Sequence, residues 1–297
     1  MADRRIVVGM DGSLASREAL VWAGRLVRVL GGRIVVVHAL DGDAGGDPIA
    51  ALPPPDLADR RYAKLTEAVE LDWCRELVRA AIRFSTVVRS GHPLDVIPEA
   101  ADLHQAGLVI VGNRGRGPTP ALGLGSTTQG MLGYGDRPVL VAPEPGVGQR
   151  HLALRQIVVS ADGSAASERA LGTISDLAVA FGSRITLVRA RGPRTHHGQP
   201  RPRIDARLPR LARRLSGRGI PVRTIVRGGD ADAVVSEAAA DIDADLVAVG
   251  AGHVLGNGYS GGRGLAAETH RPTLVVPAPA SCPRMQRPLP AHSGAAG

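Results

Sequence analysis

The run Leu108-Val109-Ile110-Val111-Gly112-Asn113-Arg114-Gly115 is followed, after nine further residues, by Gly125-Ser126-Thr127. The apolar part predicts a buried strand, and the Gly-Ser-Thr segment predicts the start of a helix. Because glycine has no Cβ, a backbone of this composition can approach a ligand closely. The first turn of a helix offers unpaired N–H groups that suit phosphate. The stretch therefore predicts a nucleotide-binding loop between a strand and a helix.

The loop matches neither of the two commoner phosphate-binding motifs. A Walker A loop needs Gly-Lys-Ser/Thr, and the single lysine, Lys64, is remote from any glycine loop. The segment Gly123–Thr128 begins like a Rossmann GxGxxG fingerprint but ends in threonine, and it does not follow the first strand of its unit. The spacing is instead Gly-x2-Gly-x9-Gly-Ser.

The same order of segments occurs twice along the chain, so we predict a duplicated unit. In each unit, short apolar runs alternate with segments of helical periodicity. The matching pairs are Arg5–Ser13 with Gln156–Ser164, Arg89–Gly91 with Arg227–Gly229, Leu108–Gly112 with Leu246–Gly250, and Arg137–Val141 with Arg271–Val275. For the first unit we expect strands near 5–9, 33–39, 84–90, 107–112 and 138–142, and helices near 13–30, 57–83, 93–105 and 125–135.

This alternation predicts an α/β fold in which right-handed crossovers build a parallel sheet with helices on both faces. Solid runs of β-branched residues such as Ile34–Val37 fit strands that are buried on both sides. Open parallel sheets bind ligands beyond the carboxyl ends of the strands, where the strand order reverses. We expect Asp11, Ala39 and Gly112 to meet at that place.

Length and composition narrow the class of protein. The 297 residues fit two domains. No apolar run approaches the ~20 residues that span a bilayer. The N-terminal segment lacks the apolar core of a signal peptide, so we expect a cytoplasmic protein without a membrane anchor. Cys74 and Cys282 are far apart, so we expect neither a disulfide framework nor a Cys-rich metal site. Cys74 is interpreted as buried filler.

The charge is strongly basic, with a formal net charge of +8 carried almost entirely by arginine. Such a balance can indicate nucleic-acid binding, but aromatic residues make up only 2% of the chain. Because bases then lack stacking platforms, we do not expect a nucleic-acid partner. Arg203, Arg207, Arg210 and Arg214 recur at helical spacing beside an apolar stripe. They form either a solvated basic face or a surface for an acidic protein, a lipid or RNA.

The chain resembles the universal stress protein family over both halves. The carrying motifs are the glycine spacing above, Asp11-Gly12-Ser13 after the first strand, the valine-rich run that ends in His38-Ala39, and Arg137-Pro138-Val139-Leu140-Val141. The resemblance implies two tandem Rossmann-like domains, each a five-stranded parallel sheet of order 3-2-1-4-5. We place them at residues 1–145 and 154–278, and we expect 279–297 to be a disordered tail.

The resemblance also implies a set of nucleotide-binding residues. Asp11 would lie beside the ribose and phosphates, and the Ala39 backbone would read the adenine edge. Arg116 would screen the γ-phosphate, and Mg²⁺ would accompany the triphosphate with Asp11 as an outer ligand. Arg114 stands where the family often has histidine. The full set of binding candidates is Gly9, Met10, Asp11, Ala39, Gly112, Gly115, Arg116, Gly125, Ser126 and Thr127.

The second unit departs from the motif. His253 stands where the second glycine belongs, and the segment from Gly250 to Pro272 is four residues shorter than its counterpart. Arg263-Gly264-Leu265 is interpreted as replacing Gly-Ser-Thr. We therefore expect the second unit to bind ATP poorly, and to pair with the first unit or with another chain in a homodimer.

Several other features receive plain structural readings. Gly258–Gly262 matches the GxSxG elbow of hydrolases, but no strand immediately precedes it. His196 and His197 lack a third metal ligand nearby, and His38 is interpreted as a packed, hydrogen-bonded histidine. Residues 41–55 are expected to form a loop over the nucleotide cleft. We predict no catalytic residue and no protein metal site.

We expect an ATP-binding stress-response regulator that acts through nucleotide-dependent conformation, with slow hydrolysis at most. Two alternatives stay open. The first is an enzyme of the adenine-nucleotide hydrolase type, although the chain lacks the Ser-Gly-Gly-x-Asp-Ser loop that such enzymes carry after the first strand. The second is a dimerisation module without a ligand, against which the intact first glycine loop argues.

Overall fold

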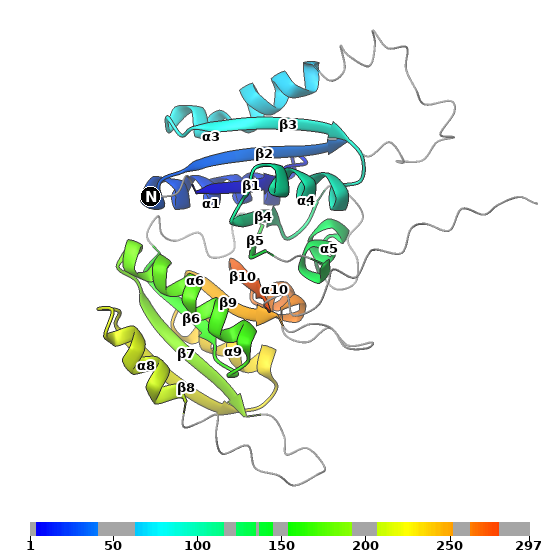
Figure 1. Cartoon of the computed structure of the whole chain (residues 1–297). Coiled ribbons are helices and arrows are strands. Elements are labelled where there is room, and N and C mark those ends of the chain that lie inside the picture. Colours follow the sequence, from blue (N-terminus) through cyan, green and yellow to red (C-terminus); the bar gives the residue numbers. More distant parts are fainter. Residues whose placement is uncertain are drawn as a thin grey trace, which may run out of the picture.

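The computed structural model describes residues 4–40, 63–115, 123–134, 137–144, 154–191, 207–251 and 262–278. The first unit contributes the strands β1 (Arg5–Gly9), β2 (Arg33–Leu40), β3 (Phe84–Ser90), β4 (Leu108–Gly112) and β5 (Val139–Ala142) (Figure 1). The second unit contributes β6 (Gln156–Ser160), β7 (Arg184–Arg191), β8 (Val222–Gly228), β9 (Leu246–Ala251) and β10 (Thr273–Pro277). The predicted tail at 279–297 and the predicted loop at 41–55 lie outside the described residues.

Helices connect the strands as the predicted alternation requires. The first unit contains α1 (Leu14–Leu30), the π-helical turn η1 (Val69–Trp73), α3 (Arg75–Arg79), α4 (Pro93–Leu103) and α5 (Ser126–Tyr134). The second contains α6 (Ala165–Phe181), α8 (Leu208–Ser216), α9 (Ala231–Asp241) and α10 (Arg263–Glu268). The Ser13 and Ser164 side chains cap α1 and α6, and Gly182 ends α6 in the left-handed conformation. No helix in the described part of the chain is long and apolar enough to cross a membrane.

The helix predicted over 57–83 is broken in the structure. Residues 63–68 are helical, η1 follows, and the Cys74 N–H bonds to the Val69 carbonyl five residues back at 3.0 Å. Both Val69 and Cys74 are fully buried. In an α-helix, two residues five positions apart point in directions that differ by more than a quarter of a turn around the axis. The wider π turn reduces this difference, so both side chains lie on the core face.

The ten strands of the described residues form one sheet, in the order β3-β2-β1-β4-β5-β10-β9-β6-β7-β8. Within each unit the strands are parallel and follow the order 3-2-1-4-5 that the resemblance implied. The two units join through β5 and β10, which pair antiparallel with Leu140 opposite Leu274. The expected α/β class is confirmed, and the sheet that crosses both units is an addition that the sequence did not predict.

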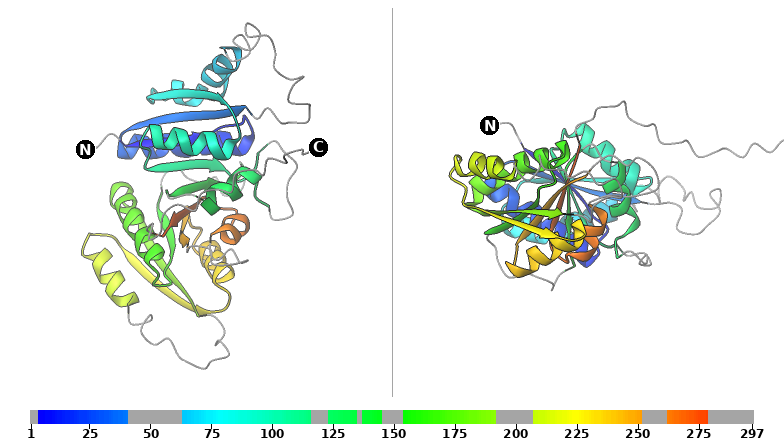
Figure 2. Two further views of the ribbon diagram at one scale, coloured as in Figure 1. Left: turned by 45° about the vertical axis from the view of Figure 1, so that its right-hand side comes forward. Right: turned by 90° about the horizontal axis from the view of Figure 1, so that it is seen from below.

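The core follows this joint. On the face covered by α1, α6 and α8, one apolar cluster contains residues of both units, including Leu26, Leu140, Ile157 and Leu274. On the other face there are two clusters, one mainly in each unit; the first also includes Ala266 of α10, and Leu132 of α5 packs against both. The helices therefore lie in layers on the two faces of the sheet (Figure 2).

Candidate functional site

The candidate site lies at the carboxyl ends of β1, β2 and β4 in the first unit. β1 stands between β2 and β4, so the chain leaves β1 for one side of the sheet and later returns on its other side. This is the reversal of strand order at which open parallel sheets bind ligands. The structure therefore brings Asp11, Ala39 and Gly112 to the same edge of the sheet, as the sequence predicted.

Asp11 holds the turn between β1 and α1. Its Oδ1 accepts a hydrogen bond from the Ser13 N–H at 2.9 Å, and Gly12 between them adopts φ 78°. The other carboxylate oxygen faces the glycine loop, because a Cβ built on Gly115 would lie 2.6 Å from Asp11 Oδ2. A larger residue at position 115 would therefore have to push the Asp11 carboxylate aside.

The two ends of the glycine loop are bonded together. The Asn113 N–H donates to the Ala142 carbonyl at 2.7 Å, and the Gly125 N–H donates to the Asn113 carbonyl at 2.8 Å. A Cβ on Gly125 would lie 3.4 Å from the Gly115 nitrogen, so the backbones of Gly115 and Gly125 are neighbours. The Asn113 Oδ1 atom is buried without a hydrogen-bond partner among the described groups.

The start of α5 faces outward. Ser126 is exposed and Thr127 is partly exposed. Thr128 turns inward, and its hydroxyl donates to the Gly112 carbonyl at 2.6 Å, which ties the helix to the end of β4. Because the first N–H groups of a helix have no intrahelical partner, this end can accept an anion.

Arg114 closes the loop, and sequence reasoning did not foresee this role. Its Nε donates to the Gly123 carbonyl at 3.0 Å, and its guanidinium lies 3.6 Å from Glu144 Oε1. Its own carbonyl accepts from the Ser13 hydroxyl at 3.4 Å. The guanidinium therefore bridges the far side of the loop and the strand end. Arg116 lies outside the described residues.

Three of the predicted binding residues have packing roles in the structure. A Cβ on Gly9 would lie 2.9 Å from Ile97 Cδ1, and a Cβ on Gly112 would lie 2.6 Å from the Ala15 carbonyl carbon. The Met10 side chain is only 4% exposed. Its N–H bonds to Val37 and its carbonyl contacts the His38 ring. These glycines let a helix pack closely on the strands, and the backbone groups of Met10 are already bonded.

Ala39 presents backbone groups toward the site. The Val37 carbonyl accepts from Met10 and the Leu40 carbonyl accepts from Gly91, so alternate residues of β2 bond to opposite sides. The backbone groups of Ala39 therefore point to the same side as those of Val37, toward β1. The last residue pair between these two strands is Gly9 with Val37. The N–H and carbonyl of Ala39 therefore extend past the end of β1.

His38 has the packed role that the sequence predicted. Its Nδ1 lies 2.7 Å from the Met10 carbonyl oxygen. Its ring meets the Trp73 ring edge to face, with centroids 5.1 Å apart. His196, His197 and the Gly258–Gly262 segment lie outside the described residues, and the described residues contain no group of three acidic, histidine or cysteine side chains that could hold a metal.

The second unit repeats the turn but not the start of the helix. Asp162 Oδ1 accepts from Ser164 at 2.8 Å, and Gly250 packs against Ala166 as Gly112 packs against Ala15. Counting back from the matched segments Arg137–Val141 and Arg271–Val275 makes Gly264 the counterpart of Gly130, not of Ser126. The interpretation that Arg263-Gly264-Leu265 replaces Gly-Ser-Thr is therefore wrong: α10 begins at the counterpart of Gln129.

The second unit also has an acidic side chain where the first unit has an apolar one. A Cβ on Gly264 would lie 2.5 Å from Asp232 Oδ2, whereas its counterpart Gly130 faces the apolar side chain of Leu94. Burial, and then Asp230 and Glu268, raise the pKa of Asp232 above its ordinary value. Carboxylates therefore stand beside α10, and they oppose phosphate.

The second unit also touches the first glycine loop. Arg263 of α10 donates to the Gln129 carbonyl of α5, and a Cβ on Gly123 would lie 3.9 Å from the Ala267 Cβ. The glycine loop is thus braced by the second unit at its far end.

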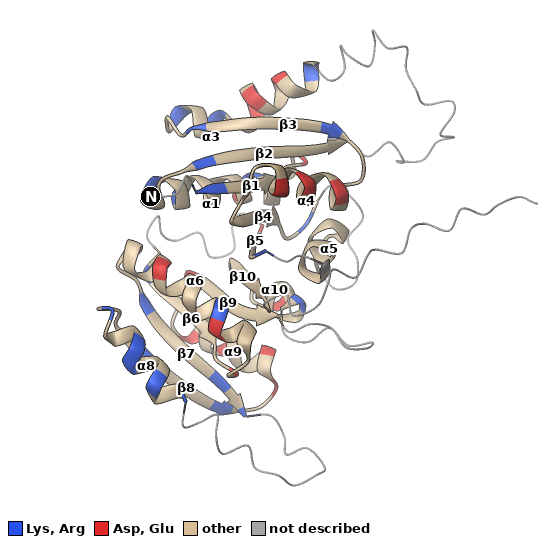
Figure 3. Ribbon diagram, viewed as in Figure 1, with Lys and Arg blue, Asp and Glu red and all other residues tan. Residues whose placement is uncertain are grey.

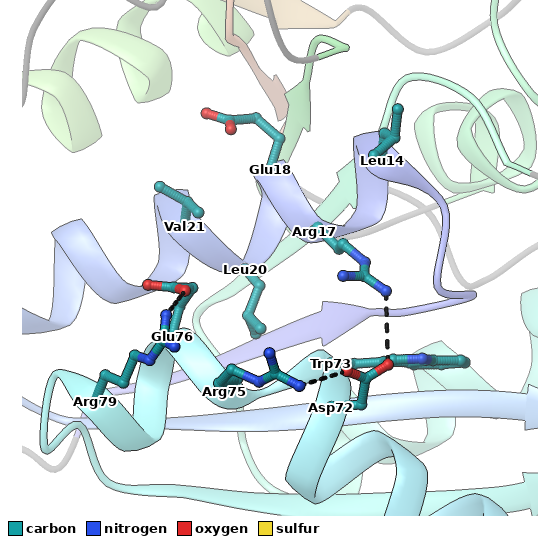
Figure 4. A pocket seen from close by; sticks show the side chains of 10 residues that line it. All are labelled: Leu14, Arg17, Glu18, Leu20, Val21, Asp72, Trp73, Arg75, Glu76 and Arg79. Atoms are coloured by element: carbon teal, nitrogen blue, oxygen red, sulfur yellow. Dashed lines mark hydrogen bonds and ion pairs between the residues drawn. The ribbon is translucent and has the colours of Figure 1, made fainter.

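A separate groove lies between α1 and α3, lined by ion-paired side chains such as Arg17 with Asp72 (Figure 4).

Comparison with known proteins agrees with this architecture. The model of the universal stress protein family matches residues 3–143 and again 153–277. A universal stress protein of Mycobacterium tuberculosis is 29% identical over 182 residues, which are 58% of this chain and 58% of the relative's length. One of Thermus aquaticus is 26% identical over 144 residues, which are 46% of this chain and 97% of the relative.

Solved structures show the same fold. The crystal structure of a universal stress protein from Archaeoglobus fulgidus superposes with a TM-score of 0.71 at 17% identity, over 93% of this chain and 99% of that one. A putative universal stress protein from Pseudomonas aeruginosa gives a TM-score of 0.61 at 17% identity, over 94% of both chains. The tandem arrangement therefore extends over nearly the whole length of these structures.

Proposed function

The chain belongs to the universal stress protein family, and we propose that its first unit binds ATP and that the protein acts as a nucleotide-dependent stress-response regulator. The nucleotide-binding domain in this proposal is residues 1–145, and the second domain is residues 154–278. The observation that carries the proposal is the approach of Gly115 to Asp11 beside the start of α5. That arrangement leaves the exposed backbone of Gly115 beside the Asp11 carboxylate, which a larger residue at this position would push aside.

The residues that would hold the nucleotide are fewer than the sequence suggested. The Ala39 backbone would read the adenine edge, and Gly115 and Gly125 would let the loop approach the phosphates. The Ser126 and Thr127 N–H and hydroxyl groups would bind phosphate oxygens, since both lie at the outward end of α5. Gly9, Met10 and Gly112 support the site by packing. Arg116 stays a prediction.

Magnesium fits the same site through the nucleotide. Mg²⁺ is bound in proteins by one or two carboxylates together with substrate phosphates and water. Asp11 is the carboxylate that faces the glycine loop, so it would serve as an outer ligand. The bound ion would supply charge neutralisation for the phosphates.

We propose that binding, not catalysis, is the function of this site. His38 of β2 is engaged with the Met10 carbonyl and the Trp73 ring. Asp11 is engaged with the Ser13 N–H. A general base would need to reach a water beside the γ-phosphate from within hydrogen-bond distance. Slow hydrolysis is therefore the most that we expect.

The experiment measures ATP affinity by equilibrium dialysis with labelled ATP and Mg²⁺. Gly115→Ala should lower the affinity by about tenfold or more, since each factor of ten equals about 1.4 kcal/mol and the new methyl would displace Asp11 or the loop. Gly107→Ala is the matched control, because a Cβ there meets nothing within 4 Å. No binding by the unaltered chain, or equal loss in both variants, would refute the proposal.

A further inference from the structure

An uncompensated basic surface covers α8 of the second unit. We define the α8 arginine face as Arg207, Arg210, Arg213 and Arg214, all of which are exposed. Figure 3 shows the blue ribbon segments of α8 without a red one among them. Within the described part of the chain, none of these four guanidinium groups has a carboxylate partner, whereas the following Arg218 pairs with Asp176 at 2.8 Å.

The equivalent helix of the first unit is built differently. It also carries arginines, but Arg75 pairs with Asp72 at 3.0 Å and Arg79 pairs with Glu76 at 3.0 Å (Figure 4). Residues 63–79 contain four acidic and three basic residues, whereas residues 207–218 contain five arginines and no acidic residue. The same place in the duplicated fold is thus charge-balanced in one unit and strongly basic in the other.

The N-terminal part of this arrangement works against the stability of α8, whereas Arg213 and Arg214 lie in the last turn, where the helix dipole favours cations. Arg207 precedes the helix and Arg210 lies in its first turn, where the positive end of the helix dipole repels cations. Arg210 and Arg214 are spaced as i and i+4, where like charges destabilise a helix. Both costs disappear when an anion neutralises the arginines, so the surface favours an anionic partner.

The apolar side of α8 limits the kind of partner. Leu208 and Leu215 are buried and Leu211 packs against the core, so α8 has no apolar stripe left for a bilayer. Residues 207–228 contain no aromatic residue, so the arginines lack the tryptophan and tyrosine anchors that accompany arginine in protein interfaces. Single strands are bound largely by stacking on aromatic rings, which this surface also lacks.

We propose that the α8 arginine face binds the phosphate backbone of double-stranded nucleic acid without reading its bases. Guanidinium groups match phosphate oxygens in planar, two-pronged hydrogen bonds. The scarcity of aromatic residues still excludes base stacking, and backbone binding does not need it. Contact with three or four phosphates gives a slope of about −3 for the logarithm of the affinity against the logarithm of salt concentration.

The test is fluorescence anisotropy with a labelled 20-base-pair DNA duplex in 50 mM NaCl. We expect binding that weakens roughly sixtyfold by 200 mM NaCl and that is the same for a duplex of scrambled sequence. Arg210→Gln with Arg214→Gln should reduce the affinity at least tenfold at 50 mM NaCl. Arg75→Gln with Arg79→Gln removes the same charge from paired arginines, so it should change the affinity less than twofold.

Three results would overturn the proposal. They are the absence of binding at 50 mM NaCl, an equal loss in the two double variants, and binding to anionic lipid vesicles in place of the duplex. A duplex RNA of the same length distinguishes the two nucleic acids, and tighter binding to either one supports the backbone mode. Circular dichroism of each variant checks that the exposed substitutions leave the fold intact.

Discussion

Gly112→Ala tests whether the first glycine of the loop serves packing or ligand binding. A methyl group at position 112 would lie 2.6 Å from the Ala15 carbonyl carbon and 2.8 Å from the Ser16 nitrogen. These are backbone atoms of α1, which cannot rotate away as a side chain can. The helix must therefore shift off β4, in a part of the core that is closely packed.

The expected loss of stability follows from that geometry. Overpacking a core by one methyl group costs about 1–3 kcal/mol, and a collision with fixed backbone places this variant near 2–3 kcal/mol. At about 2–4 °C per kcal/mol for a chain of this size, the melting temperature falls by roughly 5–10 °C. Gly250→Ala in the second unit, where the Cβ would lie 2.3 Å from the Ala166 carbonyl carbon, should lower the melting temperature by at least as much.

The assay is thermal unfolding followed by circular dichroism without nucleotide. Gly107→Ala serves as the reference, because its Cβ would meet nothing within 4 Å and the change should stay within about 1 kcal/mol. If Gly112→Ala melts at the same temperature as the unaltered chain and loses only its affinity for ATP, then the packing role is refuted. The glycine would in that case serve the ligand directly.

Three further changes test other parts of the account. Thr128→Val removes the buried hydroxyl bond to the end of β4 and should cost about 1 kcal/mol in urea unfolding, whereas Thr127→Val should cost less than half of that. Leu274 belongs to the apolar cluster that both units share, and both tryptophans lie in the first unit. Leu274→Ala should therefore lower the free energy of unfolding, followed by tryptophan fluorescence, by about 2–5 kcal/mol. An unchanged transition would show that the two units have independent cores. Burial, with Glu70 second, raises the pKa of the Cys74 thiol to about 12, so the native protein should resist thiol reagents at pH 8. Above pH 9 the free energy of unfolding should fall by about 1.4 kcal/mol per pH unit, because there only the unfolded state releases the thiol proton. A Cys74→Ala variant should lack this pH dependence.

The strands and their order could be predicted because their signals are local. Continuous β-branched runs and the Asp11-Gly12-Ser13 turn recur in both units, and the observed strand ends lie within one residue of those expected in the first unit. The joint between β5 and β10 could not be predicted in the same way. A strand that pairs antiparallel across units has the same local pattern as a strand at a free edge.

The sequence predicted which candidate residues lie near one another, and the structure adds what each of them packs against. A glycine that lets a helix approach a strand and a glycine that lets a ligand approach the loop look alike in a sequence, so Gly112 and Gly115 received the same role. Their environments differ: α1 backbone faces Gly112, and the Asp11 carboxylate faces Gly115. The contacts of Arg114 with Gly123 and Glu144 could not be predicted, because they depend on a fold that brings together residues distant in the sequence.

Isothermal titration of the full chain with ATP and Mg²⁺ tests the central claim most directly. We expect one site per chain, because α10 begins a turn later than α5 and has carboxylates beside it. Replacing Gly115 with alanine should weaken that site and leave the count of sites unchanged. Absence of heat at millimolar ATP, or two equivalent sites per chain, would contradict the account.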